Sequence, residues 1–428
     1  MKGDITLCLV GAGGNYTPEL IEGVLGQSRR ELPIREIRMM DINPERLQIM
    51  AGLSRRMAQA VSCPLSIRSD TRLEPMLEGV DFVVTQIRVG GTASRRLDET
   101  IPLKYGVIGQ ETTGPGGMFK ALRTIAPMLE IARAVERAAP DAFILNYTNP
   151  SGIITEAVLK NTKAKIIGLC SGIPAVQADL AGRLRGVFPD VKTYCVGLNH
   201  LGFIHRILSN GRDVTSQAID CLLEREEAVP GGGPSLGWLK LARTLGAFPM
   251  PGYCDYFYHH RKRLEHLLSQ KQSRAEQIAE LERELYAEAA REETHSKPKV
   301  LQKRGGGGYS HVTFSVLKAI LHDTGDEIAM SARNGETVEG IPPDAAVEVV
   351  CRVSKDGVTP LPVGPIPLAF RGLVQAVKAY ETLTVEAAVR RDRHLALQAL
   401  LAHPLVGELD VAEPLLDEML TAHALDFS

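Results

Sequence analysis

The sequence predicts an α/β protein whose first part is a parallel sheet covered by helices on both faces. Three observations predict it. Continuous apolar runs alternate with amphipathic stretches up to about residue 190, as in parallel strands buried on both faces. The first apolar run leads directly into a glycine-rich turn. After residue 190 the alternation is lost, which indicates an α+β part. We therefore expect two domains, residues 1–190 and 191–428.

The expected elements follow the chain in order. Strands are expected at Ile5–Val10, Ile34–Asp41, Asp81–Ile87, Ala142–Asn146 and Ile166–Leu169, and helices at Pro18–Leu25, Pro44–Val61, Phe119–Arg137, Ser151–Leu159 and Ala175–Leu184. In the second part, strands are expected at Val196–Leu208 and Val347–Val353, and helices at Leu368–Leu383 and Val385–Leu401. Gln270–Glu293 is charged and has few large apolar residues, so we expect a solvated helix or a mobile excursion there.

The composition argues against several classes of function. The net charge of −2 gives no reason to expect nucleic acid or an anionic membrane as a partner. No apolar run is long enough to span a bilayer, and the short apolar run at the N-terminus does not lead into a cleavage site. The seven cysteines are scattered without CxxC spacing, which favours reduced thiols and a cytoplasmic location.

The turn after the first strand has the composition of a dinucleotide-binding loop. Its residues are Gly11, Ala12, Gly13, Gly14, Asn15, Tyr16 and Thr17. Glycines let the backbone approach phosphate groups closely, and N–H groups at the start of the next helix face the anion. Asp41, at the end of the second strand, can bind the adenosine ribose and would repel a 2′-phosphate, which favours NAD over NADP. Two simpler interpretations stay open: the glycines only form a turn, or Asp41 only caps the helix entered at Pro44.

Polar residues and glycines are concentrated after the strand Asp81–Ile87. Arg88 precedes the segment Gly90–Gly117, and Arg95 lies within it. Ligands of open α/β sheets bind at the carboxyl ends of the strands, and a planar guanidinium group suits phosphate or carboxylate. Arg88 and Arg95 are therefore candidates for binding an anionic group of a substrate, and the alternative is that each is a surface charge.

Four more side chains are candidates for a site. Asn149 follows a strand, and its amide suits either a pair of sugar hydroxyls or a turn before proline. Cys170 follows the next strand, and with His200 it would make half of a coordination shell for a divalent ion. From spacing alone, a buried cysteine and a hydrogen-bonded histidine are the commoner case. Tyr253 lies in an aromatic cluster that is either core or, beside a bound cation, the place of a catalytic base.

Taken together and in this order, these segments resemble glycoside hydrolase family 4, the NAD- and metal-dependent glycosidases, and especially its 6-phospho-β-glucosidases. The matching segments are Ile101–Gly117, Asn149–Gly152, Gly197–His200, Tyr16–Leu20, Lys303–Gly306 and Tyr309–Ser310. The resemblance implies that Cys170 and His200 bind Mn²⁺ or another divalent cation and that Tyr253 is the catalytic base. It also implies that Asn149, Arg95 and Arg304 contact the substrate. With a Rossmann-like first domain, the expected architecture is that of lactate and malate dehydrogenases.

The resemblance further implies a redox route to glycoside cleavage instead of the usual pair of carboxylates. NAD⁺ oxidises the sugar transiently at C3, Tyr253 removes the C2 proton, the aglycone is eliminated, and water adds before the hydride returns. Ser171 follows Cys170, where the phospho-glucosidases that we compare have Asn or Asp. Because Ser171 cannot serve as the acidic proton donor of the phospho-α-glucosidases, a β-linked sugar is expected, and its phosphorylation at C6 stays open.

Two other functions are compatible with the sequence. An NAD-dependent 2-hydroxyacid dehydrogenase of the lactate/malate type would need no cysteine ligand and would accumulate NADH. A sensor that binds NAD and sugar would keep the fold without the chemistry. For any of the three, a homodimer or homotetramer is expected, because chains of this architecture often assemble in that way.

Overall fold

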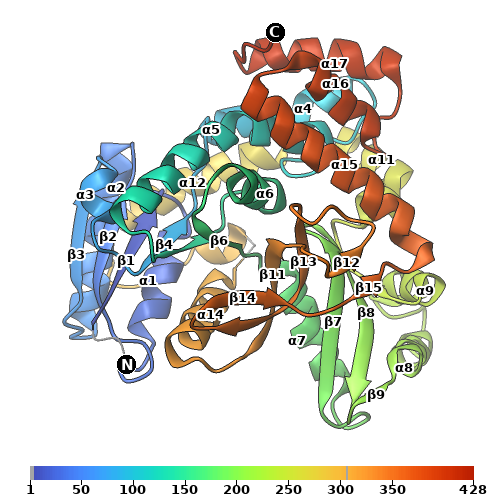
Figure 1. Ribbon diagram of the computed structural model, residues 1–428, viewed down its shortest axis with the longest axis horizontal. Helices are drawn as coiled ribbons and strands as arrows, with labels where there is room; N and C mark the ends of the chain where they lie inside the picture. Colours follow the sequence, from blue (N-terminus) through green and yellow to red (C-terminus); the bar gives the residue numbers. More distant parts are fainter. Residues whose placement is uncertain (1–3, 305–306) are drawn as a thin grey trace.

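The computed structural model describes residues 4–304 and 307–428. Gly305 and Gly306, which belong to one of the segments that carry the resemblance, lie outside the described residues. The described part contains a nine-stranded sheet with the order β14-β13-β11-β6-β5-β4-β1-β2-β3 (Figure 1). Its strands are β1 (Ile5–Val10), β2 (Ile34–Met40), β3 (Ser66–Asp70), β4 (Phe82–Thr85), β5 (Phe143–Asn146), β6 (Lys165–Gly168), β11 (Glu327–Arg333), β13 (Ala346–Ser354) and β14 (Gly357–Pro360). The strands β1 to β6 are parallel, as the sequence predicts, and β11, β13 and β14 are antiparallel.

Helices cover both faces of the parallel strands, whose apolar residues are therefore buried. The helices of the first part are α1 (Thr17–Leu25), α2 (Pro44–Ala60), α3 (Glu74–Leu77), α4 (Gly91–Lys104), α5 (Gly114–Ala138), α6 (Ser151–Asn161) and α7 (Gly172–Leu184). All residues of β4 and β5 are buried, as expected of central strands in such a sheet. This arrangement confirms the predicted α/β class with a Rossmann-like first part.

The second half of the chain forms a separate small sheet and the remaining helices. The small sheet consists of β7 (Val191–Leu198), β8 (Leu201–Ser209), β9 (Arg212–Asp213) and β10 (Phe248–Pro249), and β12 (Val338–Glu339) pairs with β15 (Gly364–Pro365). The helices are α8 (Thr215–Glu227), α9 (Leu236–Leu245), α10 (Asp255–Tyr258), α11 (His260–Ser269), α12 (Arg274–Ala290), α13 (Leu301–Arg304), α14 (Tyr309–His322), α15 (Leu368–Arg390), α16 (Arg393–Ala402) and α17 (Leu409–Ala422). Figure 1 shows α15, α16 and α17 at one end of the molecule and β9 at the other.

Several elements differ from the sequence prediction. The expected strand Val196–Leu208 is two antiparallel strands, β7 and β8, which reverse at Asn199 and His200. The polar segment Gly90–Gly117 contains the helix α4, and α15 continues through the break expected near residue 384. The strands β11, β13 and β14 extend the N-terminal sheet, so the predicted boundary near residue 190 does not separate two sheets. The division into domains 1–190 and 191–428 stays a prediction.

The helix expected within Gln270–Glu293 is confirmed, but the expectation that it is only solvated is wrong. The segment forms α12, which packs on α2 and α4 and buries small or medium apolar residues at helical spacing, namely Ala275, Ile278, Leu285 and Ala289. A capping box starts the helix: Ser273 Oγ accepts from the N–H of Glu276, and the Glu276 carboxylate accepts from the N–H of Ser273. Despite its many charged residues, this helix packs against the first part of the fold.

Candidate active site

Four adjacent parallel strands end at one edge of the sheet and bring the candidate residues together. In the order β6-β5-β4-β1, these strands lead to Cys170, Asn149, Arg88 and the loop Gly11–Tyr16. Neighbouring strand ends are about 4.8 Å apart, so the edge forms a continuous row from a thiol to a glycine loop. Ligands of open α/β sheets bind at such an edge.

The glycine loop has the geometry that an anion requires. Gly11 has a φ of +85°, and a Cβ atom there would lie 3.0 Å from the backbone of Gln86. The Gln86 amide donates to Thr17 Oγ1 (2.7 Å), and the Thr17 hydroxyl donates to the carbonyl of Ala12 (2.8 Å). Tyr16 is the N-cap of α1, and its side chain does not cap the helix. The loop therefore directs a helix N-terminus toward the edge of the sheet.

Asp41 contacts this loop directly. Its carboxylate accepts from the N–H of Gly13 (2.9 Å) and from the N–H of Asn43 (2.9 Å). The helix α2 is capped by Asn43, whose side chain accepts from the N–H of Arg46 (3.0 Å). The alternative that Asp41 caps this helix is therefore wrong, and its role toward a ribose stays a prediction.

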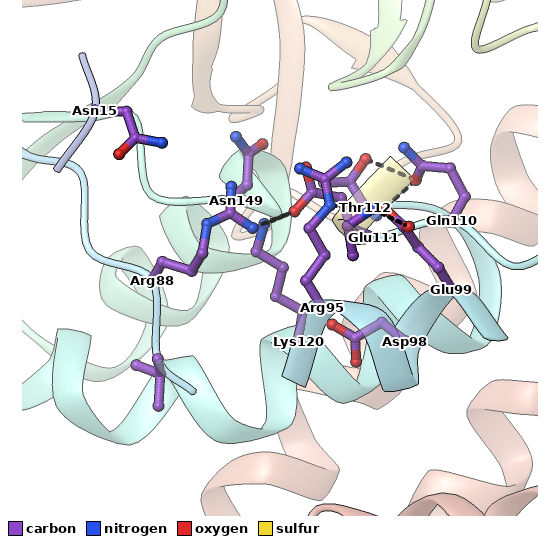
Figure 2. A network of polar contacts seen from close by, with 12 residues as sticks. Asn15, Arg88, Arg95, Asp98, Glu99, Gln110, Glu111, Thr112, Lys120 and Asn149 are labelled. Carbon is purple, nitrogen blue, oxygen red and sulfur yellow. Dashed lines mark hydrogen bonds and ion pairs between the residues drawn. The ribbon is translucent and has the colours of Figure 1, made fainter. Parts of the chain in front are cut away.

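Arg88 and Arg95 converge on Glu111, and Lys120 of α5 joins them, with Asn149 alongside (Figure 2). Arg95 Nη1 lies 3.0 Å from one Glu111 oxygen, and Lys120 Nζ lies 2.7 Å from the other. Arg95 Nε also donates to Glu99 (2.7 Å). We call Arg88, Arg95, Lys120, Glu99 and Glu111 the cation cluster. It holds three basic side chains and two carboxylates, so its net charge is positive when Lys120 is protonated.

Burial and pairing decide the protonation states in the cation cluster. Burial opposes ionisation of Glu111, but Arg88, Lys120 and Arg95 outweigh it and hold the pKa of that carboxyl well below its usual range. Burial, with repulsion from Arg88, lowers the pKa of Lys120 to about 7, although Glu111 opposes this change. Two arginines therefore carry the fixed positive charge, and Lys120 titrates near neutral pH.

Cys170 and His200 come together although they are distant in the sequence. Cys170 Sγ lies 3.8 Å from His200 Nε2, and the other ring nitrogen, Nδ1, is 2.9 Å from the hydroxyl of Thr112. This contact leaves Nε2 facing the thiol, as in a metal-binding histidine whose second nitrogen is hydrogen-bonded. Sulfur and imidazole suit transition metals. The described residues contain no group of three His, Cys, Asp or Glu side chains that could hold a metal. Further ligands would have to come from a substrate or from water.

The backbone at His200 is held in an unusual conformation. Its φ is +65°, in the left-handed region that non-glycine residues seldom adopt, and it lies in the tight reversal between β7 and β8. Such strain costs about 1–3 kcal/mol and is frequent at functional sites. Asn199, in the same reversal, donates to the buried Glu348 of β13 (3.2 Å). The turn is thus anchored to the large sheet.

Tyr253 stacks on the His200 ring, with the ring centroids 3.8 Å apart and the planes at 10°. Burial, with a contribution from Cys170, raises the pKa of Tyr253. Burial, with a contribution from Glu348, raises the pKa of Cys170 to about 12, and burial lowers the pKa of His200 to about 3. In this state all three groups are neutral. The thiol and the phenol would lose their protons only with positive charge beside them, whereas the neutral imidazole can already donate a lone pair to a metal.

Two predicted substrate residues lie at the margins of the site. Within the described part of the chain, the hydrogen bonds of Asn149 are long, to Tyr147 O (3.5 Å) and from the N–H of Ser151 (3.4 Å), and they leave capacity for a ligand. Arg304 reaches the glycine loop: its guanidinium lies over the Tyr16 ring, 4.4 Å from the centroid, and bonds to the Tyr16 hydroxyl. The substrate roles of Asn149 and Arg304 stay predictions.

The sequence alone indicates no role for Glu111, Thr112 or Lys120. Glu111 and Thr112 lie in the glycine-rich segment that drew attention to Arg95, and a lone acid there is a signal that could have been used. Lys120 is buried in α5 between Phe119 and Ala121. A lysine within an apolar helix turn normally has a buried partner, which is the signal that would have found it.

The chain also matches known proteins along nearly its whole length. The model "Family 4 glycosyl hydrolase" matches residues 6–185, and "Family 4 glycosyl hydrolase C-terminal domain" matches residues 195–406. The chain belongs to the family 4 glycosyl hydrolases. It is a glycosidase, as the sequence resemblance predicts.

Individual members of family 4 support this assignment. The "Probable 6-phospho-beta-glucosidase" of Bacillus subtilis is 38% identical over 99% of this chain and 97% of its own length. A solved structure of the 6-phospho-β-glucosidase of Thermotoga maritima, with manganese, NAD⁺ and glucose-6-phosphate, is 31% identical and has a TM-score of 0.87. That similarity covers 99% of both chains.

The dehydrogenase alternative receives support for the fold alone. The lactate dehydrogenase of Cryptosporidium parvum is 14% identical with a TM-score of 0.52, over 91% of this chain and 98% of its own. The family 4 hydrolase therefore shares the predicted dehydrogenase-like architecture but not the sequence of that class. Among the described residues, no helix has the length and apolar character needed to cross a membrane.

Proposed function

We propose that this family 4 hydrolase cleaves 6-phospho-β-glucosides with the help of NAD and Mn²⁺ or another divalent cation. The observation that carries the proposal is the row of groups along one sheet edge, from Cys170 with His200, through the cation cluster, to the glycine loop. In this order, a sugar at the cation cluster would lie between a metal at Cys170 and His200 and a nicotinamide beside the glycine loop. The relative from Thermotoga maritima, solved with manganese, NAD⁺ and glucose-6-phosphate, supports the same set of ligands.

The first part of the site would hold NAD. The residues that we assign to it are Gly11, Gly13, Gly14, Asn15, Tyr16, Thr17 and Asp41. The helix N-terminus behind the loop suits the pyrophosphate, and Asp41, fixed by the N–H of Gly13, suits the ribose hydroxyls. Its negative charge would disfavour a 2′-phosphate.

Cys170 and His200 would hold the metal, and Tyr253 would act as the base that removes the proton from C2 of the sugar. When bound, NAD supplies reversible oxidation of the sugar and the cation acidifies the C–H group beside the oxidised carbon. Tyr253 stacks on the metal-facing imidazole, so the base and the metal ligands present themselves to the same part of a sugar. Because burial raises the pKa of Tyr253, it can act as a base only with positive charge next to it.

The cation cluster would bind the anionic part of the substrate. The planar guanidinium groups of Arg88 and Arg95 suit a phosphate, and the cluster carries a positive excess when Lys120 is protonated. A 6-phosphate is the anionic group that this charge excess favours, with Asn149 and Arg304 as further substrate contacts. Ser171, which carries no acid, supports a β-linked substrate.

We further propose a cytoplasmic protein that assembles as a homodimer or homotetramer. All seven cysteines are free in the structure, which fits a reducing compartment. Chains of this dehydrogenase-like architecture often form such assemblies.

The direct test compares aryl 6-phospho-β-glucoside with the unphosphorylated glucoside, each with NAD⁺, Mn²⁺ and a thiol reductant. The proposal expects release of the aryl group from the phosphorylated compound, no accumulation of NADH at 340 nm, and loss of activity when NAD⁺ or Mn²⁺ is removed. Preference for the unphosphorylated glucoside would remove the assigned role of the cation cluster. Accumulation of NADH would favour the dehydrogenase.

A further inference from the structure

Two residues of α12, Glu282 and Tyr286, hold the nucleotide loop from the second half of the chain. We infer that they are positioning residues for the cofactor, an inference that rests on the proposed binding of NAD to this loop. They lie four residues apart and therefore share one face of the helix. That face meets the loop at Gly13 and Asn15.

The contacts are short and specific. Asn15 Nδ2 donates to Glu282 Oε1 (2.8 Å), and both side chains are buried. The Tyr286 hydroxyl lies 2.7 Å from the carbonyl of Gly13, to which it donates, and 3.3 Å from Asn15 Oδ1. Both ends of the Asn15 amide thus meet groups of α12, and the side chain cannot turn toward a ligand without breaking these contacts.

The helix that makes these contacts is itself fixed at both ends. At its start, the N–H of Ala275 donates to Glu99 (2.7 Å), the carboxylate that also pairs with Arg95. At its end, Arg56 of α2 donates to the carbonyl of Ala289 (2.6 Å). Glu282 and Tyr286 are therefore presented by a rigid element that also reaches the cation cluster.

Charge argues that the role of Glu282 is positional. A carboxylate near a site for a pyrophosphate weakens binding of that anion by repulsion, so its direct electrostatic effect on NAD is unfavourable. The bond to Asn15 instead fixes the loop before the ligand arrives, and a preformed loop loses less conformational entropy on binding. Replacement by glutamine removes the charge and keeps an oxygen that can accept from Asn15.

The experiment measures the Kd of NAD⁺ by isothermal titration calorimetry for the full chain and four variants. Tyr286→Phe and Glu282→Ala should each raise the Kd about 3- to 10-fold, the effect of one lost hydrogen bond. Glu282→Gln should bind NAD⁺ at least as tightly as the original chain. Glu284→Gln, on the exposed face of the same helix, should leave the Kd unchanged. The kcat at saturating NAD⁺ should change less than twofold in all four variants.

The outcomes separate the inference from the function on which it rests. If the original chain binds no NAD⁺, the proposed function fails and the inference fails with it. If the chain binds NAD⁺ and both Tyr286→Phe and Glu282→Ala bind it equally well, only the inference is overturned. It is also overturned if Glu282→Gln binds as weakly as Glu282→Ala. Tyr286→Phe keeps the ring and its packing, so it reports on the hydroxyl even if Glu282→Ala unfolds.

Discussion

The two halves of the candidate active site differ in how their charges are arranged. Around Glu111, three basic side chains and two carboxylates are paired in a network that forms without any ligand. Around Cys170, the thiol, the imidazole and the phenol are neutral, because burial disfavours the charged form of each. One half is already charged and organised, and the other depends on a cation from outside.

This difference indicates which of the two halves can take part in the reaction. Fixed charges can bind and orient an anionic sugar, but they do not change during a reaction. Neutral groups that ionise or coordinate when a metal arrives can change the acidity of a neighbouring C–H bond. We therefore propose that the cation cluster serves binding and that the half around Cys170, with His200 and Tyr253, serves the reaction.

The largest expected effect comes from removing the thiol. Cys170→Ser should reduce the rate of glycoside cleavage by about 10³-fold, because the loss of the metal removes several kcal/mol of transition-state stabilisation. Activity is measured with added Mn²⁺ and then with EDTA. Cys221→Ser is the matched control, since this cysteine lies in α8 outside the site, and should keep full activity. Full activity of Cys170→Ser in EDTA would exclude a metal at this place.

Removing the shared carboxylate of the cation cluster should lower the stability of the fold. Glu111→Gln leaves Arg88, Arg95 and Lys120 without their shared carboxylate and should lower the free energy of unfolding by about 3–5 kcal/mol. Urea denaturation measures this change. The control is Glu418→Gln, which breaks a surface pair with Lys104 and should cost less than about 1 kcal/mol. Equal effects of the two substitutions would show that the cluster is not a buried network.

A smaller effect is expected at the hydroxyl that orients His200. Thr112→Val removes the partner of His200 Nδ1 and should weaken Mn²⁺ binding by about 10- to 100-fold. The affinity is measured by titrating Mn²⁺ against activity. Thr112→Ser keeps the hydroxyl and should restore most of the affinity. An unchanged affinity in Thr112→Val would mean that His200 is held by its stacking on Tyr253 alone.

The smallest expected effect is the change in Mn²⁺ affinity for each pH unit. Burial raises the pKa of Cys170 to about 12, so the thiol is protonated at neutral pH and must lose its proton to bind a metal. His200 has a pKa of about 3 and is already neutral above pH 5. The apparent Mn²⁺ affinity should therefore rise about tenfold per pH unit between pH 5 and 8. A flat profile would show that Cys170 is not a ligand.

The sequence alone predicts those parts of the site that come directly after a strand. Asn149, Cys170 and the glycine loop each come immediately after a buried apolar run, and parallel strands place such ends at one edge. The pairing of Cys170 with His200 was not predictable from spacing and came from the family resemblance. The structure brings them together because the reversal between β7 and β8 reaches back to the sheet edge.

Other features depend on contacts between distant segments. Glu111 and Lys120 join Arg95 in one network only because α4 and α5 pack side by side. The sequence predicts a solvated helix at α12 because the segment is charged and has few large apolar residues, and because Glu282, which is buried, counts as exposed in a hydropathy pattern. The helix is buried because it packs against α2, α4 and the glycine loop.

The proposed mechanism requires Tyr253 to remove a proton from C2 of the sugar during cleavage. Hydrolysis of an aryl 6-phospho-β-glucoside in D₂O, followed by mass spectrometry of the released sugar, tests it directly. We expect deuterium at C2 of the product in the presence of NAD⁺ and Mn²⁺, and exchange about 10²- to 10⁴-fold slower in Tyr253→Phe. Product formed at the full rate with hydrogen retained at C2 would contradict it.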